Sequence, residues 1–474
     1  MKKKIHTDIC IIGGGAGGLT LAAIASQLGA KVVLVEAGEL GGDCLNRGCV
    51  PSKALIAAAN CLQSIRSSKN FGIISGEPRC NFKLIHDQIR GVINAIAPKD
   101  SIERFQGLGV TVIREFGKFV GPTRVQAGDT LVHAKRFVIA TGSKPVTPSI
   151  PGLDEVDYLT NETIFNKKKA PLHLLVLGGG PTGSELAQAY RRLGCKVTLL
   201  EQSRILENVD PEVSDVVRNK MLQEGVVIYE GIQILCVKKK NDVIIINIRD
   251  RHGDFAIQGS DLLVAVGREP ELKELDLDRA SIKYDTKGIN VDRRLRSTNK
   301  KVFAIGDVVG HYQFTHMAEY HAGIAIRNIL FKFPAKTDYS CFPSVIFTTP
   351  EVAEVGMSEK SARERFGDIR IFRQSFAEND RATIEKNVEG LAKIVTRPNG
   401  AILGATIVGP HAGELIQSWL IPIKKKMKIA SMAGLIVPYP TLGEINQRVA
   451  RRYYVFLLFS EKVKRIVRFL LKFP

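Results

Sequence analysis

Short apolar runs alternate with longer amphipathic segments along this chain, and the alternation predicts parallel strands joined by helices. Four mainly apolar runs have the length of a buried strand, at 8–12, 31–35, 173–177 and 196–200. Segments of helical character follow the first and third runs, at 19–28 and 184–193. Strands and helices in this order indicate an α/β fold.

A glycine-rich turn follows the first apolar run and predicts a dinucleotide site. The run 8–12 leads into Gly13-Gly14-Gly15-Ala16-Gly17-Gly18, and Glu36 follows the next strand. In such a unit, Gly13 permits the tight turn, Gly15 lets the backbone approach a pyrophosphate, and Gly18 allows close packing of the helix. The helix N-terminus receives the phosphates, and Glu36 accepts hydrogen bonds from an adenosine ribose.

The same unit recurs in the middle of the chain. Its turn contains Gly178, Gly180 and Gly183. Glu201 then follows the run 196–200, and the acid lies 23 residues after the first glycine in both copies (36 − 13 and 201 − 178). One glycine motif is a weak signal, but two copies, each between strand and helix and each with its acid, predict two bound dinucleotides.

Two cysteines lie close together after the first unit. Cys44 and Cys49 are separated by four residues, and Pro51 suits the start of a helix. Cysteines at this spacing can close a small disulfide loop on the first helical turn. The partial positive charge of a helix N-terminus lowers the pKa of a thiol and makes the reactive thiolate more abundant. The pattern therefore describes a redox-active pair.

The segment from Gly41 to Lys53 resembles the active-site segment of the class I pyridine nucleotide–disulfide oxidoreductases. This family includes lipoamide dehydrogenase, glutathione reductase and mercuric reductase, and the resemblance extends over about residues 5–450. It implies that the first glycine unit, with Gly42 nearby, holds FAD and that the second holds the nicotinamide cofactor. The carboxylate of Glu201 favours NADH over NADPH because it would repel a 2′-phosphate, although Arg204 is close enough to offset part of this preference.

Three further segments match landmarks of the family in order. They are 138–142 with Thr141 and Gly142, 263–270 with Gly267, and 302–307 with Gly306 and Asp307. The first two resemble the strands that leave the FAD and NAD domains. The third resembles the second FAD fingerprint, in which the Asp bonds the flavin ribitol, so this role is assigned to Asp307.

The resemblance also implies roles for side chains around the flavin. Lys53 and Glu185 hold the positions of a Lys beside the flavin N5 and of the Glu that pairs with it. Electrons are expected to pass from NAD(P)H through FAD to the disulfide Cys44–Cys49. Cys49 is then the flavin-proximal, charge-transfer thiol, and Cys44 is the interchange thiol that attacks the acceptor.

The chain departs from the family pattern near its C-terminus. Disulfide-reducing members use a His-Pro-Thr-x-x-Glu motif of the partner subunit, and Tyr439 and Glu444 take the positions of its His and Glu. A phenol, with a reference pKa of about 10, is a poor proton shuttle for thiols, whereas imidazole, at about 6.5, is well matched. Tyr at this place resembles the mercuric-reductase-like branch, in which it helps to hold a metal ion. The resemblance also implies a homodimer.

We therefore predict an NAD(P)H-dependent, FAD-containing dithiol oxidoreductase of the mercuric-reductase-like branch. Its small-molecule acceptor is a metal ion such as Hg(II), a quinone or an unusual disulfide. Whether the protein reduces Hg(II) is left open, because the sequence has no N-terminal Cys-x-x-Cys and no vicinal cysteines after Cys341. A dihydrolipoamide dehydrogenase is the alternative, and Tyr439 argues against it. The alternative of another class is a flavin-loaded redox sensor or a membrane-associated interaction protein.

The predicted architecture has two Rossmann-like dinucleotide-binding domains and a C-terminal α+β dimerisation domain. The ranges are 1–150 for the FAD domain, with a helical insertion at about 50–110, then 151–270 for the NAD(P) domain, 271–340 for the second part of the FAD domain, 341–450 for the dimerisation domain and 451–474 for a basic tail.

Composition narrows the partners and the location. The formal net charge is +19, but no nucleic-acid-binding motif accompanies it, so we predict no such partner. Eight cysteines with one tight pair fit a reducing cytoplasm rather than a disulfide scaffold. No apolar run reaches the length of about 18 residues that a membrane span needs. No structural metal site is predicted.

The end of the chain predicts an amphipathic helix. Apolar residues recur at helical spacing at Val463, Ile466, Val467, Leu470 and Leu471. Basic residues fill other positions, at Lys462, Lys464, Arg465, Arg468 and Lys472. Such a helix is typical of a peripheral contact with a membrane, here at its inner face, and the alternative is a helix that packs its apolar face on the dimer.

Overall fold

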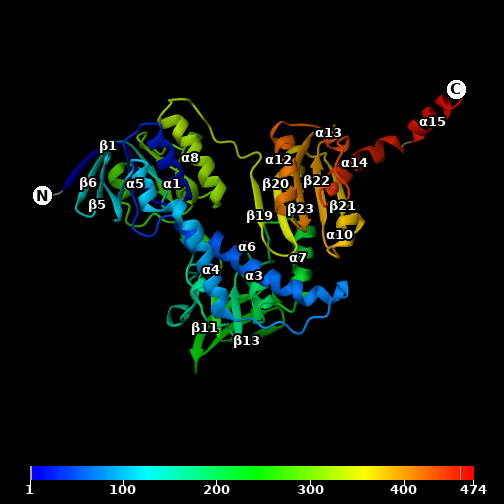
Figure 1. The fold of residues 1–474 in the computed structure, drawn as a ribbon, viewed down its shortest axis with the longest axis horizontal. Coiled ribbons are helices and arrows are strands. Elements are labelled where there is room, and N and C mark those ends of the chain that lie inside the picture. The colour runs from blue at the N-terminus through cyan, green and yellow to red at the C-terminus, as the bar shows by residue number, and fades with distance from the viewer. Residues whose placement is uncertain (1–2, 460, 474) are drawn as a thin grey trace.

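The computed structural model describes residues 3–459 and 461–473, and Figure 1 shows them as three lobes with a projecting tail. Residues 1–2, 460 and 474, which belong to the predicted first domain and to the tail, lie outside the described residues. The N-terminal lobe lies at the left, the second lobe below it, and the C-terminal lobe at the right. Parallel sheets in the first two lobes and an antiparallel sheet in the third confirm the predicted fold class.

A seven-stranded sheet organises the N-terminal lobe, in the order β3-β2-β1-β6-β5-β4 with β18 beside β6. Its strands are β1 (Lys3–Ile12), β2 (Val32–Val35), β3 (Thr111–Ile113), β4 (Gly117–Gly121), β5 (Arg124–Ala127), β6 (Thr130–Ile139) and β18 (Val302–Ala304). The strands β3, β2, β1, β6 and β18 are parallel. Residues 9–12 of β1 are buried, with Ile9 and Ile11 facing helices on one side of the sheet, and Cys10 and Ile12 facing residues of β4, β5 and short loop segments.

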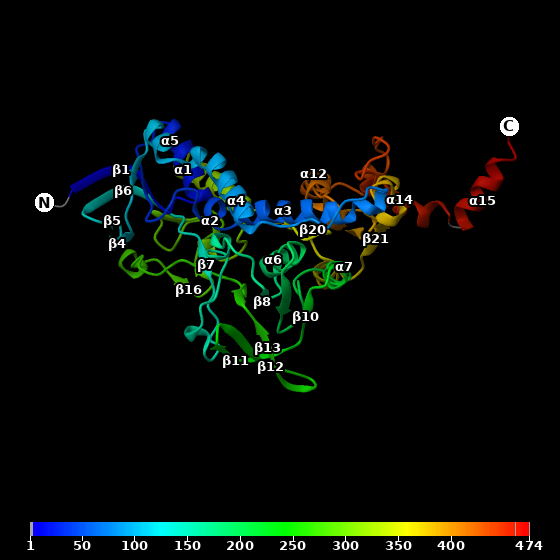
Figure 2. The same cartoon turned by 60° about the horizontal axis from the view of Figure 1, so that its bottom comes forward.

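Helices cover this sheet and extend toward the second lobe. They are α1 (Ala16–Gln27), α2 (Gly42–Asn46), α3 (Cys49–Ser67), α4 (Phe82–Ile96), α5 (Ile102–Gly107) and α8 (Thr315–Ile329). α1 begins three residues before the predicted helix because Gly17 and Gly18, which look like turn residues in the sequence, are helical and buried. The long α3 starts at Cys49 and runs alongside α6 (Pro181–Arg192), which is seen best in Figure 2.

The second lobe contains a four-stranded parallel sheet in the order β10-β9-β8-β14. Its strands are β8 (His173–Leu177), β9 (Lys196–Leu200), β10 (Val227–Tyr229) and β14 (Asp261–Val264), and α6 and α7 (Pro211–Gln223) accompany them. A three-stranded antiparallel sheet follows, made of β11 (Gln233–Lys240), β12 (Val243–Asp250) and β13 (Gly253–Gly259). Beyond this lobe, two further short pairs are β7 (Ser143–Pro145) with β15 (Arg268–Pro270), and β16 (Tyr284–Asp285) with β17 (Gly288–Ile289).

A five-stranded antiparallel sheet in the order β19-β20-β23-β22-β21 forms the C-terminal lobe. Its strands are β19 (Pro343–Ile346), β20 (Glu351–Gly356), β21 (Arg370–Ser375), β22 (Leu391–Thr396) and β23 (Ile402–Gly409). Its helices are α9 (Glu359–Phe366), α10 (Asp380–Ile384), α11 (Ala412–Leu415), α12 (Gln417–Lys424), α13 (Ala430–Ala433) and α14 (Glu444–Leu458). Trp419 of α12 is fully buried in the core between helices and sheet.

The tail forms one further helix, α15 (Glu461–Leu470), which extends away from the C-terminal lobe in Figures 1 and 2. A helix at this position agrees with the helical spacing of the apolar residues in the sequence. Within the described part of the chain, no helix is long and apolar enough to cross a bilayer.

Candidate active site

The two cysteines of the predicted redox pair occupy adjacent helices. Cys44 lies in the short helix α2, and Cys49 is the first residue of α3. The two sulfur atoms are not covalently bonded to each other in the structure, so the contacts described below are those of two free thiols. A hydrogen bond joins the two sulfur atoms.

The surroundings of the two cysteines lower the pKa of one thiol and raise the pKa of the other. The hydrogen bond from Cys44 is the main cause that lowers the pKa of Cys49 to about 6, and the Thr315 hydroxyl and the Lys53 ammonium lower it further against the effect of burial. The Oγ1 atom of Thr315, at the start of α8, lies 3.4 Å from the Cys49 Sγ. The same thiol–thiol bond, together with burial, raises the pKa of Cys44. Near neutral pH, Cys49 is therefore the thiolate and Cys44 holds the proton.

An ion pair lies one helical turn after Cys49. The Nζ atom of Lys53 donates a hydrogen bond of 2.8 Å to Oε2 of Glu185, which projects from α6. Glu185 is buried, and its Oε1 accepts a hydrogen bond of 2.8 Å from the backbone N–H of Phe347. The Lys53 ammonium lies 4.6 Å from the centroid of the Phe347 ring. Three lobes thus meet at this pair, which fixes the position of Lys53 relative to the thiols.

The two glycine-rich turns have the same geometry. Gly13 and Gly178 adopt φ angles of +109° and +104°, which disfavour any residue with a Cβ atom, and such an atom would also collide with the backbone of Ala140 or Ala265. In contrast, an added Cβ atom at Gly180 would have no neighbour within 4 Å, and at Gly15 the nearest atom is 3.9 Å away. The second glycine of each turn therefore faces open space at a helix N-terminus, which suits a pyrophosphate.

The third glycine of each unit allows the helix to approach the turn closely. A Cβ atom at Gly18 or Gly183 would collide with the carbonyl oxygen of Gly13 or Gly178. These close approaches explain why the glycine spacing is identical in the two copies.

The two acids also have matching environments. Glu36 accepts hydrogen bonds from the backbone N–H groups of Gly14 at 2.5 Å and Gly38 at 2.6 Å. Glu201 accepts hydrogen bonds from the N–H groups of Gly179 at 2.6 Å and Ser203 at 3.0 Å. Each carboxylate is thereby held beside its glycine turn.

A polar cluster connects the first two lobes next to Cys44. The Ser143 hydroxyl donates a hydrogen bond of 2.6 Å to Oδ2 of Asp307, and Arg268 donates one of 2.8 Å to Ser143. Arg268 also pairs with Asp43 at 3.3 Å. Burial raises the pKa of Asp307 and that of Asp43.

The remaining predicted glycines and Thr141 surround this cluster. Gly42 starts α2, Gly142 follows β6, Gly267 precedes β15, and Gly306 starts a short 3-10 helix that contains Asp307. The Thr141 hydroxyl donates a hydrogen bond of 2.8 Å to the carbonyl oxygen of Glu271.

Comparisons with known proteins agree with this arrangement. The family described as pyridine nucleotide-disulphide oxidoreductase matches residues 7–322, and its dimerisation domain matches residues 342–450. The chain is 34% identical over 464 residues to a mercuric reductase of Streptomyces lividans, covering 95% of this chain and 97% of that protein. It is equally 34% identical over 442 residues to a dihydrolipoyl dehydrogenase of Thermus scotoductus, covering 92% of this chain and 95% of that protein.

A solved structure, the Cu(II) complex of the HOCl-induced flavoprotein disulfide reductase RclA from Escherichia coli, has a similar fold. The TM-score is 0.84 with 26% sequence identity, over 96% of this chain and all of that chain (100%). The chain belongs to the pyridine nucleotide–disulfide oxidoreductases. FAD and a pyridine nucleotide are the cofactors of this family, and the match to the dimerisation domain supports a homodimer.

The residues of this oxidoreductase fit two dinucleotides. The turn at Gly15, the start of α1 and Glu36 would hold the adenine half of FAD, and the half-buried carboxylate of Asp307 would face its ribitol. The turn at Gly180 and the acid Glu201 would hold the pyridine nucleotide. The open space at both turns supports this fit, and among the described residues no side chain caps the start of α1 or α6.

The structure does not connect Tyr439 and Glu444 with the thiols of the same oxidoreductase chain. The Tyr439 side chain is 68% exposed, and a hydrogen bond with Asp380 raises the pKa of its phenol. Glu444 is buried, and its Oε1 lies 3.4 Å from Arg448. Among the described residues its Oε2 has no hydrogen-bond partner.

Sequence reasoning missed Thr315 and the pair Asp43–Arg268 of the oxidoreductase. Thr315 lies 266 residues after Cys49, and no motif links the two positions. Arg268 directly follows Gly267 in the segment 263–270, which the sequence matches to the strand that leaves the NAD domain. This position next to the FAD domain is the signal by which the sequence could have identified Arg268.

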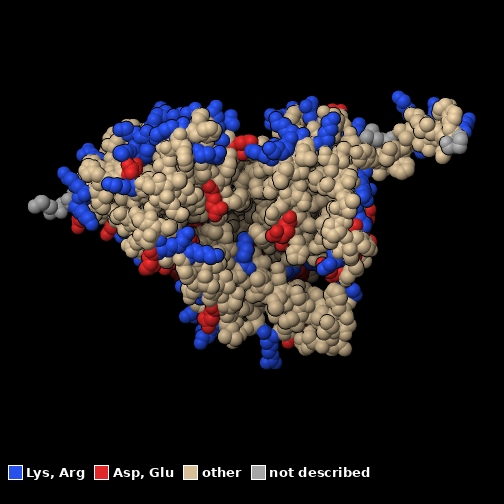
Figure 3. All heavy atoms as spheres, turned by 45° about the horizontal axis from the view of Figure 1, so that its top comes forward, with Lys and Arg blue, Asp and Glu red and all other residues tan. Residues whose placement is uncertain are grey.

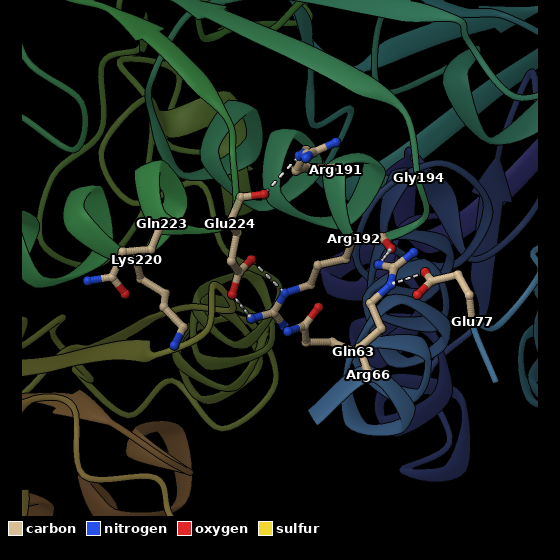
Figure 4. A pocket seen from close by; sticks show the side chains of 9 residues that line it. All are labelled: Gln63, Arg66, Glu77, Arg191, Arg192, Gly194, Lys220, Gln223 and Glu224. Atoms are coloured by element: carbon tan, nitrogen blue, oxygen red, sulfur yellow. Dashed lines mark hydrogen bonds and ion pairs between the residues drawn. The ribbon is translucent and has the colours of Figure 1, made fainter. Parts of the chain in front are cut away.

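A hollow lined by polar and charged side chains lies where the first two lobes meet. It measures about 480 Å³ and lies between α3, α6 and α7, as Figure 4 shows. Its basic side chains all have partners: Arg192 pairs with Glu224 at 2.6 Å, and Lys220 pairs with Glu389 at 2.8 Å. Arg66 donates a hydrogen bond of 3.1 Å to Glu77. The hollow therefore joins the first two lobes and offers no free cation to a ligand.

Proposed function

We propose that this oxidoreductase uses NAD(P)H and FAD to keep Cys44 and Cys49 reduced and passes the electron pair to a small acceptor at these thiols. The observation that carries this proposal is the position of Cys49 at the start of α3, with the Thr315 hydroxyl 3.4 Å from its sulfur and the Lys53–Glu185 ion pair one helical turn away. When bound, FAD supplies the two-electron link between the nicotinamide and the disulfide.

The residues of the chain have separate tasks in this relay. Cys49 provides the thiolate nearest the flavin site, and the Thr315 hydroxyl and the Lys53 ammonium stabilise its charge. Cys44 attacks or binds the acceptor and gives up its proton in doing so. Glu185 holds Lys53 in place through a hydrogen bond of 2.8 Å.

A soft metal ion is the acceptor class that this site supports best. Two thiols at one helix N-terminus are ligands that soft ions prefer, and the phenol of Tyr439 offers no proton shuttle near neutral pH. With Hg(II), the balanced reaction is Hg(II) + NADH → Hg(0) + NAD⁺ + H⁺. The similarity to mercuric reductases supports this branch, and the equal similarity to dihydrolipoyl dehydrogenase keeps lipoamide as the comparison acceptor.

A quinone is a second candidate because an apolar hollow of about 370 Å³ lies between α8 and α12. His316, which follows Thr315, stacks its ring on Phe342 with centroids 5.2 Å apart, and a flat ring could extend this stack. Other residues that line the hollow are Met317, Tyr320, Leu420 and Ile421. The hollow would hold the ring, and the balanced reaction would be quinone + NADH + H⁺ → quinol + NAD⁺, with the second proton taken from solvent.

We propose NADH as the preferred donor. The Glu201 carboxylate lies beside the second glycine turn, where it would bond a free 2′-hydroxyl and repel a 2′-phosphate. Arg204, the nearest candidate to bind such a phosphate, is in an ion pair with Asp215. We also propose a reducing cytoplasm as the location, since eight cysteines with one tight pair do not make a disulfide scaffold.

An anaerobic acceptor panel tests the proposal. The enzyme is reduced with NADH or NADPH and then mixed with Hg(II), Cu(II), a water-soluble quinone or lipoamide. Turnover with a metal ion that exceeds lipoamide turnover at least tenfold, and a larger kcat/KM for NADH, are expected. Faster lipoamide turnover would identify a dihydrolipoamide dehydrogenase, and no turnover with any acceptor would indicate a redox sensor. The Cys61→Ser variant is a matched control because Cys61 is an exposed cysteine on the same helix α3.

A further inference from the structure

The helix α15 presents an apolar face that no described residue of the chain covers. No residue of the helix is buried. Large apolar side chains of the tail are about half exposed or more, with Ile466 at 48%, Phe469 at 59%, Leu470 at 58% and Leu471 at 79%. An exposed apolar surface of this kind marks an interaction site.

We propose that residues 461–473 lie in the interface of an anionic lipid bilayer and bring the oxidoreductase to the membrane surface. The proposal rests on the tail and not on the choice of acceptor.

The tail separates apolar from basic residues as an interfacial helix requires. At 100° per residue, Val463, Ile466, Val467 and Leu470 fall on one side of the helix. Lys464, Arg465, Arg468 and Lys472 fall on the opposite side. A helix with this division lies in the plane of the interface, with its apolar side among the acyl chains and its basic side at the headgroups. Its ten residues are too few to span the bilayer.

Charge favours lipid over a second copy of the chain as the occupant of this face. Residues 461–473 contain five basic residues and one acidic residue, so their net charge is +4 (5 − 1). The whole chain carries a formal charge of +19, so a partner subunit would repel the tail on average. Anionic headgroups are complementary to it, and each Lys or Arg near such a surface adds to the attraction.

The lobe that carries the tail is basic as well. Lys425, Lys426 and Lys428 follow α12 and are exposed. Figure 3 shows Lys and Arg side chains gathered over the face that includes this part of the C-terminal lobe, with few acidic side chains among them. This face would add a diffuse attraction to the same anionic surface.

Vesicle co-sedimentation with the full-length, FAD-loaded protein tests the proposal. The probes are vesicles of phosphatidylcholine alone and vesicles with about 30% phosphatidylserine. The variant Ile466→Asp/Leu470→Asp removes the apolar side. A second variant, Lys464→Glu/Arg468→Glu, reverses two charges of the basic side and keeps the apolar residues.

Binding to the anionic vesicles at least tenfold tighter than to the neutral ones is expected. Each double variant should lose at least tenfold in affinity, and added salt should weaken the wild-type binding. NADH turnover without vesicles should be the same in all variants, which separates this result from the outcome of the acceptor panel.

Two outcomes would overturn the proposal. One is equal binding of the wild type and the apolar-side variant to anionic vesicles. The other is loss of the dimer in that variant, measured by sedimentation velocity, because this would show that the partner subunit covers the helix.

Discussion

Around Cys49, side chains from three helices meet within one subunit, whereas Tyr439 lies at the surface of the C-terminal lobe with its phenol directed to Asp380. Both regions were assigned catalytic residues from the sequence. In the first, Lys53, Glu185 and Thr315 already fix the charge of the thiolate. In the second, the carboxylate of Glu444 has an oxygen atom with no partner among the described residues. The groups around the thiolate thus come from one subunit, whereas the described residues show no contact between the thiols and Tyr439 or Glu444.

Removal of the thiolate should have the largest effect. In Cys49→Ser, turnover with any acceptor should fall by at least about 10³-fold, or about 4 kcal/mol of transition-state stabilisation, because a hydroxyl cannot replace the sulfur in the disulfide. The long-wavelength absorbance band of the reduced enzyme, which arises from a thiolate against the flavin, should also disappear. Stopped-flow spectra measure both. A Cys49→Ser enzyme that keeps the band would place the thiolate at Cys44.

Removal of the Cys44 thiol, which donates the hydrogen bond to Cys49, should have the next largest effect. In the reduced wild type, alkylation of Cys49 should rise through pH 6 and then level off, because the thiolate is the reactive form above its pKa of about 6. In Cys44→Ala the pKa should return toward the reference value of about 8.5, which lowers the alkylation rate at pH 6.5 roughly fifty-fold. Cys44→Ser keeps a donor and should lie between them. Identical pH profiles for Cys44→Ala and Cys44→Ser would mean that the donor has no influence.

Neutralising Glu185 should reduce turnover by about tenfold, equivalent to about 1.4 kcal/mol. Glu185→Gln keeps the shape of the side chain but leaves the Lys53 ammonium without its ion-pair partner, so Lys53 is less well held beside the thiols. The control is Glu162→Gln, which breaks the more exposed Arg47–Glu162 pair of 3.5 Å and should change turnover by less than about twofold. Equal kcat values for the two variants would show that the Lys53–Glu185 pair is only structural.

The smallest effect is expected at Tyr439, on the surface of the C-terminal lobe. Tyr439→His should raise lipoamide turnover about threefold to tenfold, because an imidazole with a reference pKa of about 6.5 can exchange protons with thiols. Tyr439→Phe serves as the control and should give no gain. If the two variants reduce lipoamide at the same rate, position 439 takes no part in proton transfer.

Residues close together in sequence gave reliable predictions. The apolar runs 173–177 and 196–200 coincide with β8 and β9, since each is a short, mostly branched run that ends at a turn residue. The family resemblance pairs Lys53 with Glu185, and the structure joins the two side chains by a hydrogen bond of 2.8 Å. The catalytic and cofactor roles of these residues stay predictions.

The missed contacts depend on the tertiary fold. Thr315 reaches Cys49 only because β18 adds to the N-terminal sheet and directs α8 toward the thiols. The Asp43–Arg268 pair likewise joins segments from two lobes. Neither contact has a periodicity or a motif that a sequence can reveal. For α15 the amphipathic pattern predicts a helix, but it cannot distinguish a lipid surface from a protein surface.

Near neutral pH the thiol pair holds one proton, and this determines how many protons are released when a metal ion binds. When a soft cation binds both sulfur atoms, the thiolate of Cys49 has no proton to lose, and only Cys44 must release one. Between about pH 7 and 8, binding of one cation should therefore release one proton. The apparent dissociation constant should then fall tenfold for each unit by which the pH rises. An ordinary pair of protonated thiols would liberate two protons and show a hundredfold dependence, so this enzyme should retain metal in mildly acidic conditions where such a pair would release it.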